Sequence, residues 1–191
     1  DGMISRVMRA AYEHRPQQAA IAEAVERALA NRTHLIVEAG TGVGKSLAYL
    51  VPLVLWSREE NRRAVVATYT KALQQQLMEK DLPFLRSVLG EFRYALSVGG
   101  ENYLCLRRFD HLRMGDLYEQ SEVQALNRLF EWSTVTGTGL RSDLDIEPSP
   151  ALWSKACRQA DICFGRECSY YKECFYQKAK AVELQAHILV A

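Results

Sequence analysis

The sequence predicts an α/β fold with a parallel sheet that is interrupted by a mostly helical insertion. Over the first 100 residues, short β-branched runs alternate with helical patterns, which is typical of a parallel sheet covered by helices. Residues 101–180 contain no strong strand pattern but carry all five cysteines, and "HILVA" at residues 187–191 again indicates a core strand. We therefore expect residues 1–100 and 181–191 to build one domain and residues 101–180 to form an insertion.

Composition limits the function only weakly. The 191 residues are 48% apolar and 25% charged, with a net charge of +1, which gives no overall bias towards nucleic acid or membrane. The longest apolar run, "LAYLVPLVLW", is too short to cross a bilayer, and residues 1–16 lack the apolar core of a signal peptide. We expect a cytoplasmic protein without membrane association, in which cysteines indicate metal ligands or buried thiols before disulfides.

The first elements can be followed along the chain. Residues 17–30 place apolar side chains at helical spacing. The run "THLIVEA" at residues 33–39 is β-branched and apolar, and we predict a buried strand there. It leads directly into "GTGVGKS" and then into a helix that begins "SLAYLVPLVLW".

The later elements continue the alternation and then break it. Residues 64–68 predict a second buried strand, residues 71–80 a helix and residues 94–99 a third strand. Within the expected insertion, helices are predicted around residues 121–132 and again from 174 to 186, where the second leads into the final strand.

A phosphate-binding loop is the clearest motif. "AGTGVGKS", residues 39–46, fits the Walker A pattern with Ala in place of the first Gly, and the required strand before and helix after are both predicted. Glycines let successive N–H groups point at a phosphate chain, while a Lys charge and a Ser hydroxyl suit the terminal phosphates and Mg²⁺. The alternative is a glycine-rich turn that ends in Gly-Lys-Ser by chance. The candidate nucleotide-binding residues of the loop are Gly40, Thr41, Gly42, Val43, Gly44, Lys45 and Ser46.

A glutamine upstream is a weaker candidate. Gln18 in "RPQQ" could read adenine, because a glutamine amide can accept from the N6 amine and donate to N7 at once. A solvated glutamine on a helix surface is the alternative.

Several segments together resemble a known family. "RPQQAAI", "EAGTGVGKSLAYLVP", "TYTKALQQQL", "ENYLC", "CFGREC" and "CFYQKAK" are similar to segments of the DinG-type helicases, bacterial relatives of the XPD family in helicase superfamily 2. The resemblance runs from about Tyr12 to the C-terminus. It implies a RecA-like domain that uses ATP and Mg²⁺ and acts in DNA repair. It also implies 5′→3′ movement along single-stranded DNA, on forked or displaced-strand substrates, and a [4Fe–4S] cluster in an insertion of the first motor domain.

The resemblance assigns roles residue by residue. Gln18 matches the adenine-reading glutamine, with Arg15 beside it, and Lys45 and Ser46 match the catalytic phosphate and magnesium residues.

Some further residues match DNA-contacting positions of the family, and others are candidates for contact with DNA because of their charge. Thr68, Thr70 and Gln74 match the segment that touches the DNA backbone in such motors, where hydroxyls and amides bind phosphate without reading sequence. A strand end and a helix cap are the ordinary explanation for the two threonines. Arg107 and Lys172 lie beside the cysteines in the sequence and are candidates for backbone contact, although solvated charges are the alternative.

The cysteine spacing alone leaves two metal centres open. Three cysteines fall within "CFGRECSYYKECF", residues 163–175, and clustered thiols suggest a disulfide, zinc or an iron–sulfur cluster. Structural zinc usually takes pairs of cysteines separated by two to four residues, and no Cys-x-x-Cys occurs here. Four thiolates also suffice for a [4Fe–4S] centre.

The resemblance selects a ligand set. The family's cluster ligands map to Cys105, Cys163, Cys168 and Cys174, with 57, 4 and 5 residues between them. Cys157 could replace Cys105 in a more local site, but the "NYLC" match favours Cys105 and makes Cys157 a buried or spare thiol. Metal–thiolate bonds would fix the shape of a small, loop-rich insertion.

The sequence departs from the family in two places. No Asp-Glu-x-His or Asp-Glu-x-Asp occurs, and the second motor domain is absent, so we expect at most weak nucleotide binding and no turnover by these residues alone. The family often has Lys-Gly-Arg where this chain has Val98, Gly99 and Gly100. Two other functions stay open: a non-motor P-loop regulatory or scaffold module with a Cys₄ zinc site, and a catalytically inactive DNA-binding protein.

Overall fold

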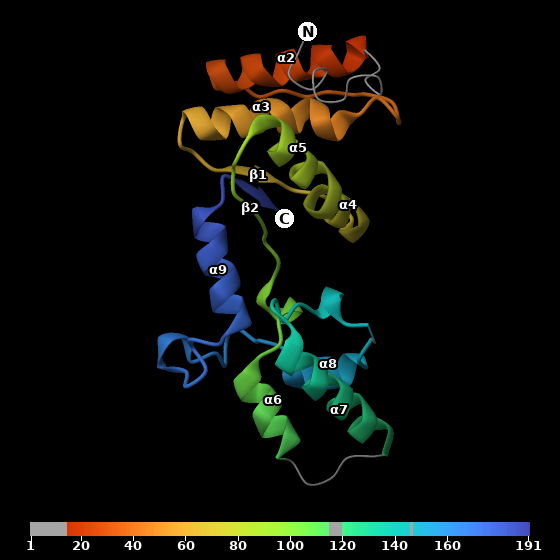
Figure 1. Cartoon of the computed structure of the whole chain (residues 1–191), viewed down its shortest axis with the longest axis vertical. Coiled ribbons are helices and arrows are strands. Elements are labelled where there is room, and N and C mark those ends of the chain that lie inside the picture. The colour runs from red at the N-terminus through yellow and green to blue at the C-terminus, as the bar shows by residue number, and fades with distance from the viewer. Residues whose placement is uncertain (1–14, 115–119, 146) are drawn as a thin grey trace. The chain divides into compact units, whose positions relative to one another are not determined.

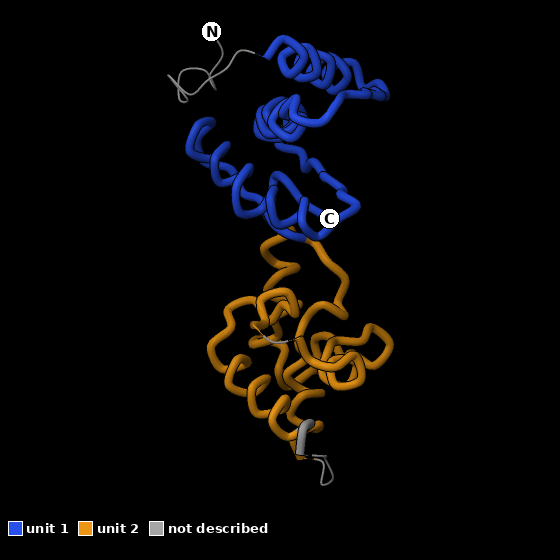
Figure 2. Tube along the Cα trace, turned by 90° about the vertical axis from the view of Figure 1, so that its right-hand side faces the viewer, with its two compact units in different colours: residues 1–96, 185–191 blue, residues 97–184 orange. Residues whose placement is uncertain are grey.

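The computed structural model describes residues 15–114, 120–145 and 147–191. The chain divides into two compact units: unit 1 comprises the described residues up to Leu96 together with residues 185–191, and unit 2 comprises residues 97–184 (Figure 2). Residues 1–14, on which the prediction of no signal peptide rests, lie outside the described residues. Within the described part of the chain, no helix has the length and apolar character needed to cross a bilayer.

Unit 1 combines a small sheet with helices (Figure 1). Its three strands are all parallel and lie in the order β1-β3-β2, which confirms the predicted α/β class with a parallel sheet. Its elements in chain order are α2 (Pro16–Asn31), α3 (Lys45–Glu59), β1 (Ala64–Val66), α4 (Lys71–Gln76), the π-helical turn η2 (Leu77–Asp81), α5 (Leu82–Leu89), β2 (Tyr94–Leu96) and β3 (Ile188–Val190).

The central strand of the sheet comes from the end of the chain. Ile188 of β3 pairs with Ala64 of β1 on one side and with Tyr94 of β2 on the other. Ile188 and Val190 are fully buried and pack with apolar side chains of α3 and α5, among them Leu50. Each such buried aliphatic side chain stabilises the fold by about 1.5–3 kcal/mol.

The predicted strand at residues 33–39 is wrong. These residues form no strand, and Leu35, Ile36 and Val37 are 42%, 97% and 43% exposed. A strand requires a neighbouring backbone that completes its hydrogen bonds, and none of the three described strands pairs with this run.

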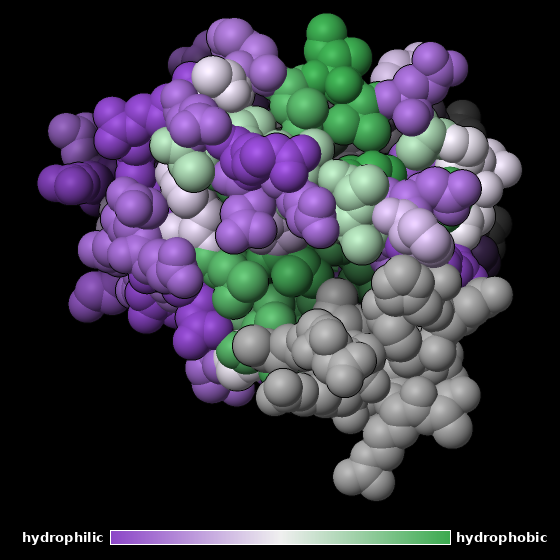
Figure 3. Space-filling view, turned by 90° about the horizontal axis from the view of Figure 1, so that it is seen from above, coloured by the Kyte–Doolittle hydropathy of each residue, from purple (hydrophilic) through white to green (hydrophobic). Residues whose placement is uncertain are grey.

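Figure 3, seen from the side of α2, shows hydrophilic side chains over much of the surface with apolar patches between them.

Unit 2 is mostly helical, as predicted. Among its described residues the only β-type pairings are two isolated bridges, Tyr103–Leu140 and Leu104–Cys157. Its separate core includes Phe109, Leu129 and Trp153. Its helices and helical turns are η3 (Gly100–Asn102), α6 (Leu106–Arg113), α7 (Gln120–Val135), η4 (Arg141–Asp143), α8 (Pro150–Ala156), η5 (Gly165–Glu167) and α9 (Phe175–Gln185), the last residue of which belongs to unit 1.

The central position of β3 gives a test of the sheet. Ile188→Ala should lower the free energy of unfolding of unit 1 by about 2–5 kcal/mol, because it leaves a cavity between strands and helices. Val65→Ala, on an edge strand and 61% exposed, should change it by less than about 0.5 kcal/mol. Urea unfolding followed by circular dichroism measures both, and equal effects would contradict the assignment of β3 as the core strand.

Candidate nucleotide and metal sites

The glycine-rich loop has the backbone conformation that its sequence predicts. Gly42 and Gly44 both have φ of 81°, a region that other residues rarely adopt. Gly44 is also the N-cap of α3, and its carbonyl accepts from the backbone N–H of Ala48 at 3.2 Å. The loop therefore leads directly into the N-terminus of a 15-residue helix. The free N–H groups and the dipole at this helix end favour the binding of an anion.

Lys45 and Ser46 occupy the first turn of α3. The exposed Lys45 ammonium donates to the carbonyls of Ala39 at 2.9 Å and Gly40 at 2.6 Å, which keeps it beside the loop. Burial raises the pKa of Tyr49, and a hydrogen bond with the Ser46 hydroxyl opposes that rise. The Lys45 charge is thus held at the loop, while the Ser46 hydroxyl contacts Tyr49 on α3.

The N-terminal end of α2 holds the loop from a second direction. Arg15 Nη1 donates to the Gly42 carbonyl at 2.7 Å, and Gln18 Nε2 donates to the Gly44 carbonyl at 2.9 Å. A side chain at position 44 would clash with the Gln18 amide. Both upstream candidates therefore contact the loop backbone, a role that the sequence analysis did not anticipate for them.

The segment that contains Thr68 and Thr70 follows β1. The backbone N–H of Thr68 donates to the Ala191 carbonyl at 2.9 Å, and Thr70 caps α4 by accepting from the backbone N–H of Leu73 at 3.3 Å. The ordinary explanation of Thr70 as a helix cap is confirmed, while Gln74 lies within α4. Between the threonines, Tyr69 is fully exposed, and sequence reasoning did not single it out.

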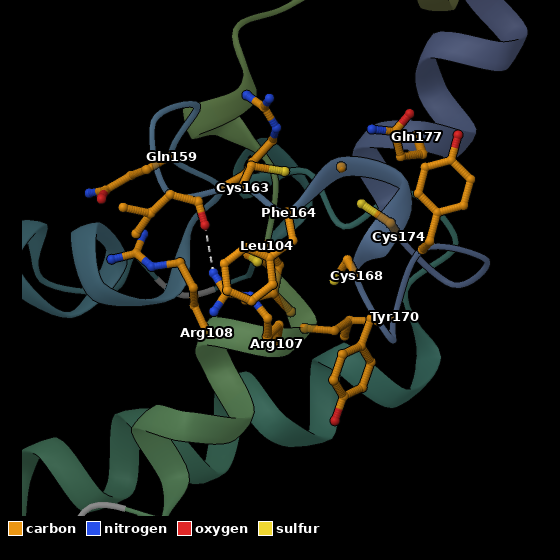
Figure 4. Close-up of a pocket in the computed structure, with 16 residues that line it drawn as sticks. Leu104, Arg107, Arg108, Gln159, Cys163, Phe164, Cys168, Tyr170, Cys174 and Gln177 are labelled. Atoms are coloured by element: carbon orange, nitrogen blue, oxygen red, sulfur yellow. Dashed lines mark hydrogen bonds between the residues drawn. The ribbon is translucent and has the colours of Figure 1, made fainter.

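Four cysteines line one cavity in unit 2. These are Cys105, at the start of α6, and Cys163, Cys168 and Cys174, which come from the segment of residues 163–174 and are labelled in Figure 4. Cys157 does not line this cavity: it is 4% exposed and belongs to the core of the unit. The structure thus brings together the four thiols that the resemblance implies as ligands.

Helix ends position two of these thiols. Cys105 is the N-cap of α6, and Cys174 immediately precedes α9. Burial raises the pKa of the Cys174 thiol, hydrogen bonds from the backbone N–H groups of Gln177 and Tyr176 lower it, and negative charge on Cys105 and Cys163 raises it. The net effect is a raised pKa of the Cys174 thiol, with burial as the largest cause, whereas a helix N-terminus by itself favours the thiolate, the form that binds metal.

Cys157 lies in a different environment. Burial raises the pKa of its thiol, an effect that Arg108 opposes. Its Sγ lies 3.8 Å from the Ser154 carbonyl, and its own carbonyl accepts a hydrogen bond from Arg108. A neutral thiol packed in the core is the state that this environment favours.

The thiols are not spaced for a single ion. Tetrahedral zinc with Zn–S bonds of about 2.3 Å places its sulfurs roughly 3.8 Å apart. Among the residues that the structure describes, no group of three or more His, Cys, Asp or Glu side chains is close enough to hold one metal ion.

A basic groove adjoins the cysteine cavity. It is lined by Arg107, Arg108, His111, Leu112, Lys155, Ile162 and Phe164. Arg107 donates to the Ile162 carbonyl at 2.8 Å, drawn as a dashed line in Figure 4, and its guanidinium lies 4.1 Å from the Phe164 ring centre. Lys172 is exposed and lines neither the groove nor the cavity. Sequence reasoning missed His111, which follows Arg107 by one turn of α6, and Lys155, which only the fold brings beside Arg107.

Comparison with known proteins identifies the family to which the chain belongs. A family of DEAD/DEAH box helicases matches residues 15–111, half of the chain and all of the phosphate loop. The chain belongs to the DEAD/DEAH box helicase family. Within that helicase family it is 32% identical over 94% of its length to the ATP-dependent DNA helicase YoaA of Haemophilus influenzae. It is 33% identical over 92% to the ATP-dependent DNA helicase DinG of Salmonella choleraesuis, and 35% identical over 91% to the ATP-dependent helicase DinG of Mycobacterium tuberculosis.

These similarities confirm the resemblance to DinG-type helicases. The matched region corresponds to 28%, 27% and 29% of the three relatives, so the chain spans just over a quarter of the helicases that it matches.

The loop geometry yields a prediction for two neighbouring glycines. Gly44→Ala should lower the free energy of unfolding by about 1–2 kcal/mol, because alanine is strained at φ of 81° and its Cβ meets the Gln18 amide. Gly40→Ala is the matched control, since a Cβ there meets nothing within 4 Å and φ is not positive. Urea unfolding of both variants should separate them; equal stability would contradict the described loop.

Proposed function

We propose that this chain provides the nucleotide-binding and cluster-binding part of an ATP-dependent DNA helicase that moves 5′→3′ along single-stranded DNA. One observation carries the proposal: a chain of this helicase family has both a phosphate loop and a cavity lined by four cysteines. Forked or displaced-strand DNA in DNA repair would be the substrate. The protein would act in the cytoplasm, where cysteines stay reduced.

The nucleotide would bind at the N-terminus of α3. The loop N–H groups and the helix end would hold the phosphates of ATP, Lys45 would add its charge at the terminal phosphates, and the Ser46 hydroxyl would bind Mg²⁺. To reach a phosphate, Lys45 would exchange its present carbonyl partners, Ala39 and Gly40, for a stronger charged acceptor. The Gln18 amide nitrogen donates to the loop carbonyl of Gly44, so its amide oxygen would be the atom that accepts a hydrogen bond from adenine.

The cysteine cavity would hold a [4Fe–4S] cluster. Cys105, Cys163, Cys168 and Cys174 would be its ligands, and the hydrogen bonds from the start of α9 would stabilise the thiolate of Cys174. When bound, the cluster would supply four covalent ties that join the start of α6, at Cys105, to the segment of residues 163–174. A rigid unit 2 could then act as a fixed surface for separated strands.

DNA would contact each unit through different residues. In unit 1, Thr68, Thr70 and Gln74 would bind phosphates, and the fully exposed Tyr69 could stack on a base. In unit 2, the basic groove that contains Arg107 offers cationic side chains together with the 58% exposed ring of Phe164. A cationic groove with an aromatic platform suits single-stranded nucleic acid without sequence preference. Lys172 would add a weaker contact at the surface.

The ligand assignment predicts a difference between two cysteines. Cys105→Ser should abolish iron binding, because it removes a ligand from the cavity. Cys157→Ser should retain the wild-type iron content, because that thiol lies in the core. Iron and labile sulfide analysis of anaerobically purified protein should give about four of each per wild-type chain. One zinc per chain would overturn the cluster, and iron loss only in Cys157→Ser would overturn the ligand set.

The phosphate loop predicts an independent loss. Lys45→Ala should weaken the binding of a fluorescent ATP analogue in the presence of Mg²⁺ by at least tenfold, because it removes the charge beside the terminal phosphates. Its iron content should stay at the wild-type value, since Lys45 belongs to unit 1 and the cysteines to unit 2. Unchanged nucleotide affinity would contradict the assignment of this loop.

A further inference from the structure

Arg158, a residue at the cysteine cavity, carries an unusual atom. It is one of the residues that line the cavity together with the four cysteines. Its Nε is buried without a hydrogen-bond partner, the only side-chain nitrogen or oxygen in the described residues of which this is true. Because a guanidinium is always protonated and has only donors, a buried N–H of this kind calls for an acceptor.

The position of Arg158 is fixed from several sides. Its backbone N–H donates to the Tyr103 carbonyl at 2.9 Å, and its guanidinium lies 4.0 Å from the centre of the Tyr176 ring. A Cβ at Gly100 would clash with Nη1 of Arg158 and lie 3.0 Å from its Cδ. The guanidinium therefore fills space that is open only because residue 100 has no side chain, and its Nε is shielded from solvent.

The other arginines of the cavity have partners. Arg107 donates to the Ile162 carbonyl and stacks on Phe164, and Arg108 donates to the Cys157 carbonyl. Arg158 thus combines a fixed cation with a donor that no protein atom satisfies.

We infer that Arg158 donates its Nε–H to a sulfur of the metal centre that the four cysteines hold. This inference rests on the proposed cluster. Four thiolates around a [4Fe–4S] core leave a net negative charge, and their sulfurs accept hydrogen bonds. A sulfur of the cluster would be the acceptor that the orphaned Nε–H of Arg158 needs, and the charge of the guanidinium would offset part of the negative charge. Since the reduced cluster is one charge more negative than the oxidised one, Arg158 favours the reduced form.

The reduction potential tests this role. In Arg158→Met, the equilibrium constant for one-electron reduction should fall about tenfold, which is about 59 mV for one electron. Arg158→Lys keeps a charge but loses the Nε donor, and its shift should be smaller. Anaerobic redox titration followed by electron paramagnetic resonance measures each potential, with iron content and circular dichroism recorded on the same samples.

Two further variants separate the hydrogen bond from general charge effects. Arg166→Met is the matched control: Arg166 lies between Cys163 and Cys168 in the sequence but is exposed and does not line the cavity, so solvent should screen its loss. Gly100→Ala changes no charge but displaces the guanidinium, so its potential should fall in the same direction as that of Arg158→Met. If Arg158→Met loses its iron, Gly100→Ala and Arg158→Lys provide the comparison.

The possible failures are distinguishable. Wild-type protein without iron would overturn the proposed cluster and this inference together. Iron-loaded variants in which Arg158→Met or Gly100→Ala shifts no further than Arg166→Met would overturn the role of Arg158 alone and leave the cluster in place.

Discussion

The pairing of β3 with a strand on each of its edges is the constraint on which the rest of the structure depends. This strand follows unit 2 in the sequence, yet it is the centre of the sheet in unit 1. The sheet is therefore complete only after the chain has passed through all of unit 2. The residue before β3, His187, is held in place as well. Its backbone carbonyl accepts a hydrogen bond from Ser57 Oγ at 3.0 Å, and its side-chain Nδ1 accepts one from the Arg93 backbone N–H at 2.9 Å. Unit 2 thus begins and ends at neighbouring parallel strands, which tie down both of its connections.

Within unit 2, one short backbone pairing distinguishes the two candidate thiols. Leu104 forms an antiparallel bridge with Cys157, and the Cys105 N–H donates to the Ala156 carbonyl at 2.9 Å. Successive side chains on extended backbone point to opposite sides. Cys105 and Leu104 both line the cavity, but Leu104 also belongs to the core of the unit, which Cys157 joins. The same pairing brings Arg158, the next residue, to the cavity wall, so a single contact sets both the thiols and their cationic neighbour.

Two separate parts of the sequence determine the structure of the phosphate loop. Its conformation comes from its own glycines, but its carbonyls are held by Arg15 and Gln18 at the start of α2. A loop whose N–H groups must face an anion gains from having its carbonyls satisfied on the other side. The close approach of Gln18 to Gly44 also gives that glycine a steric role in addition to its positive φ.

The sequence by itself determined the features that depend on neighbouring residues. Helical periodicity predicted α2, α7 and α9, and the Gly-Lys-Ser signature predicted the loop, because caps, periodicity and glycine conformations are local. Tertiary structure decided what depends on distant backbone. Residues 33–39 have the composition of a buried strand but no described partner. The burial of Cys157 in the core, the approach of Arg158 to Cys105 and the approach of Lys155 to Arg107 depend on contacts across about 50 residues. No local pattern encodes such contacts, because they exist only once the chain has packed.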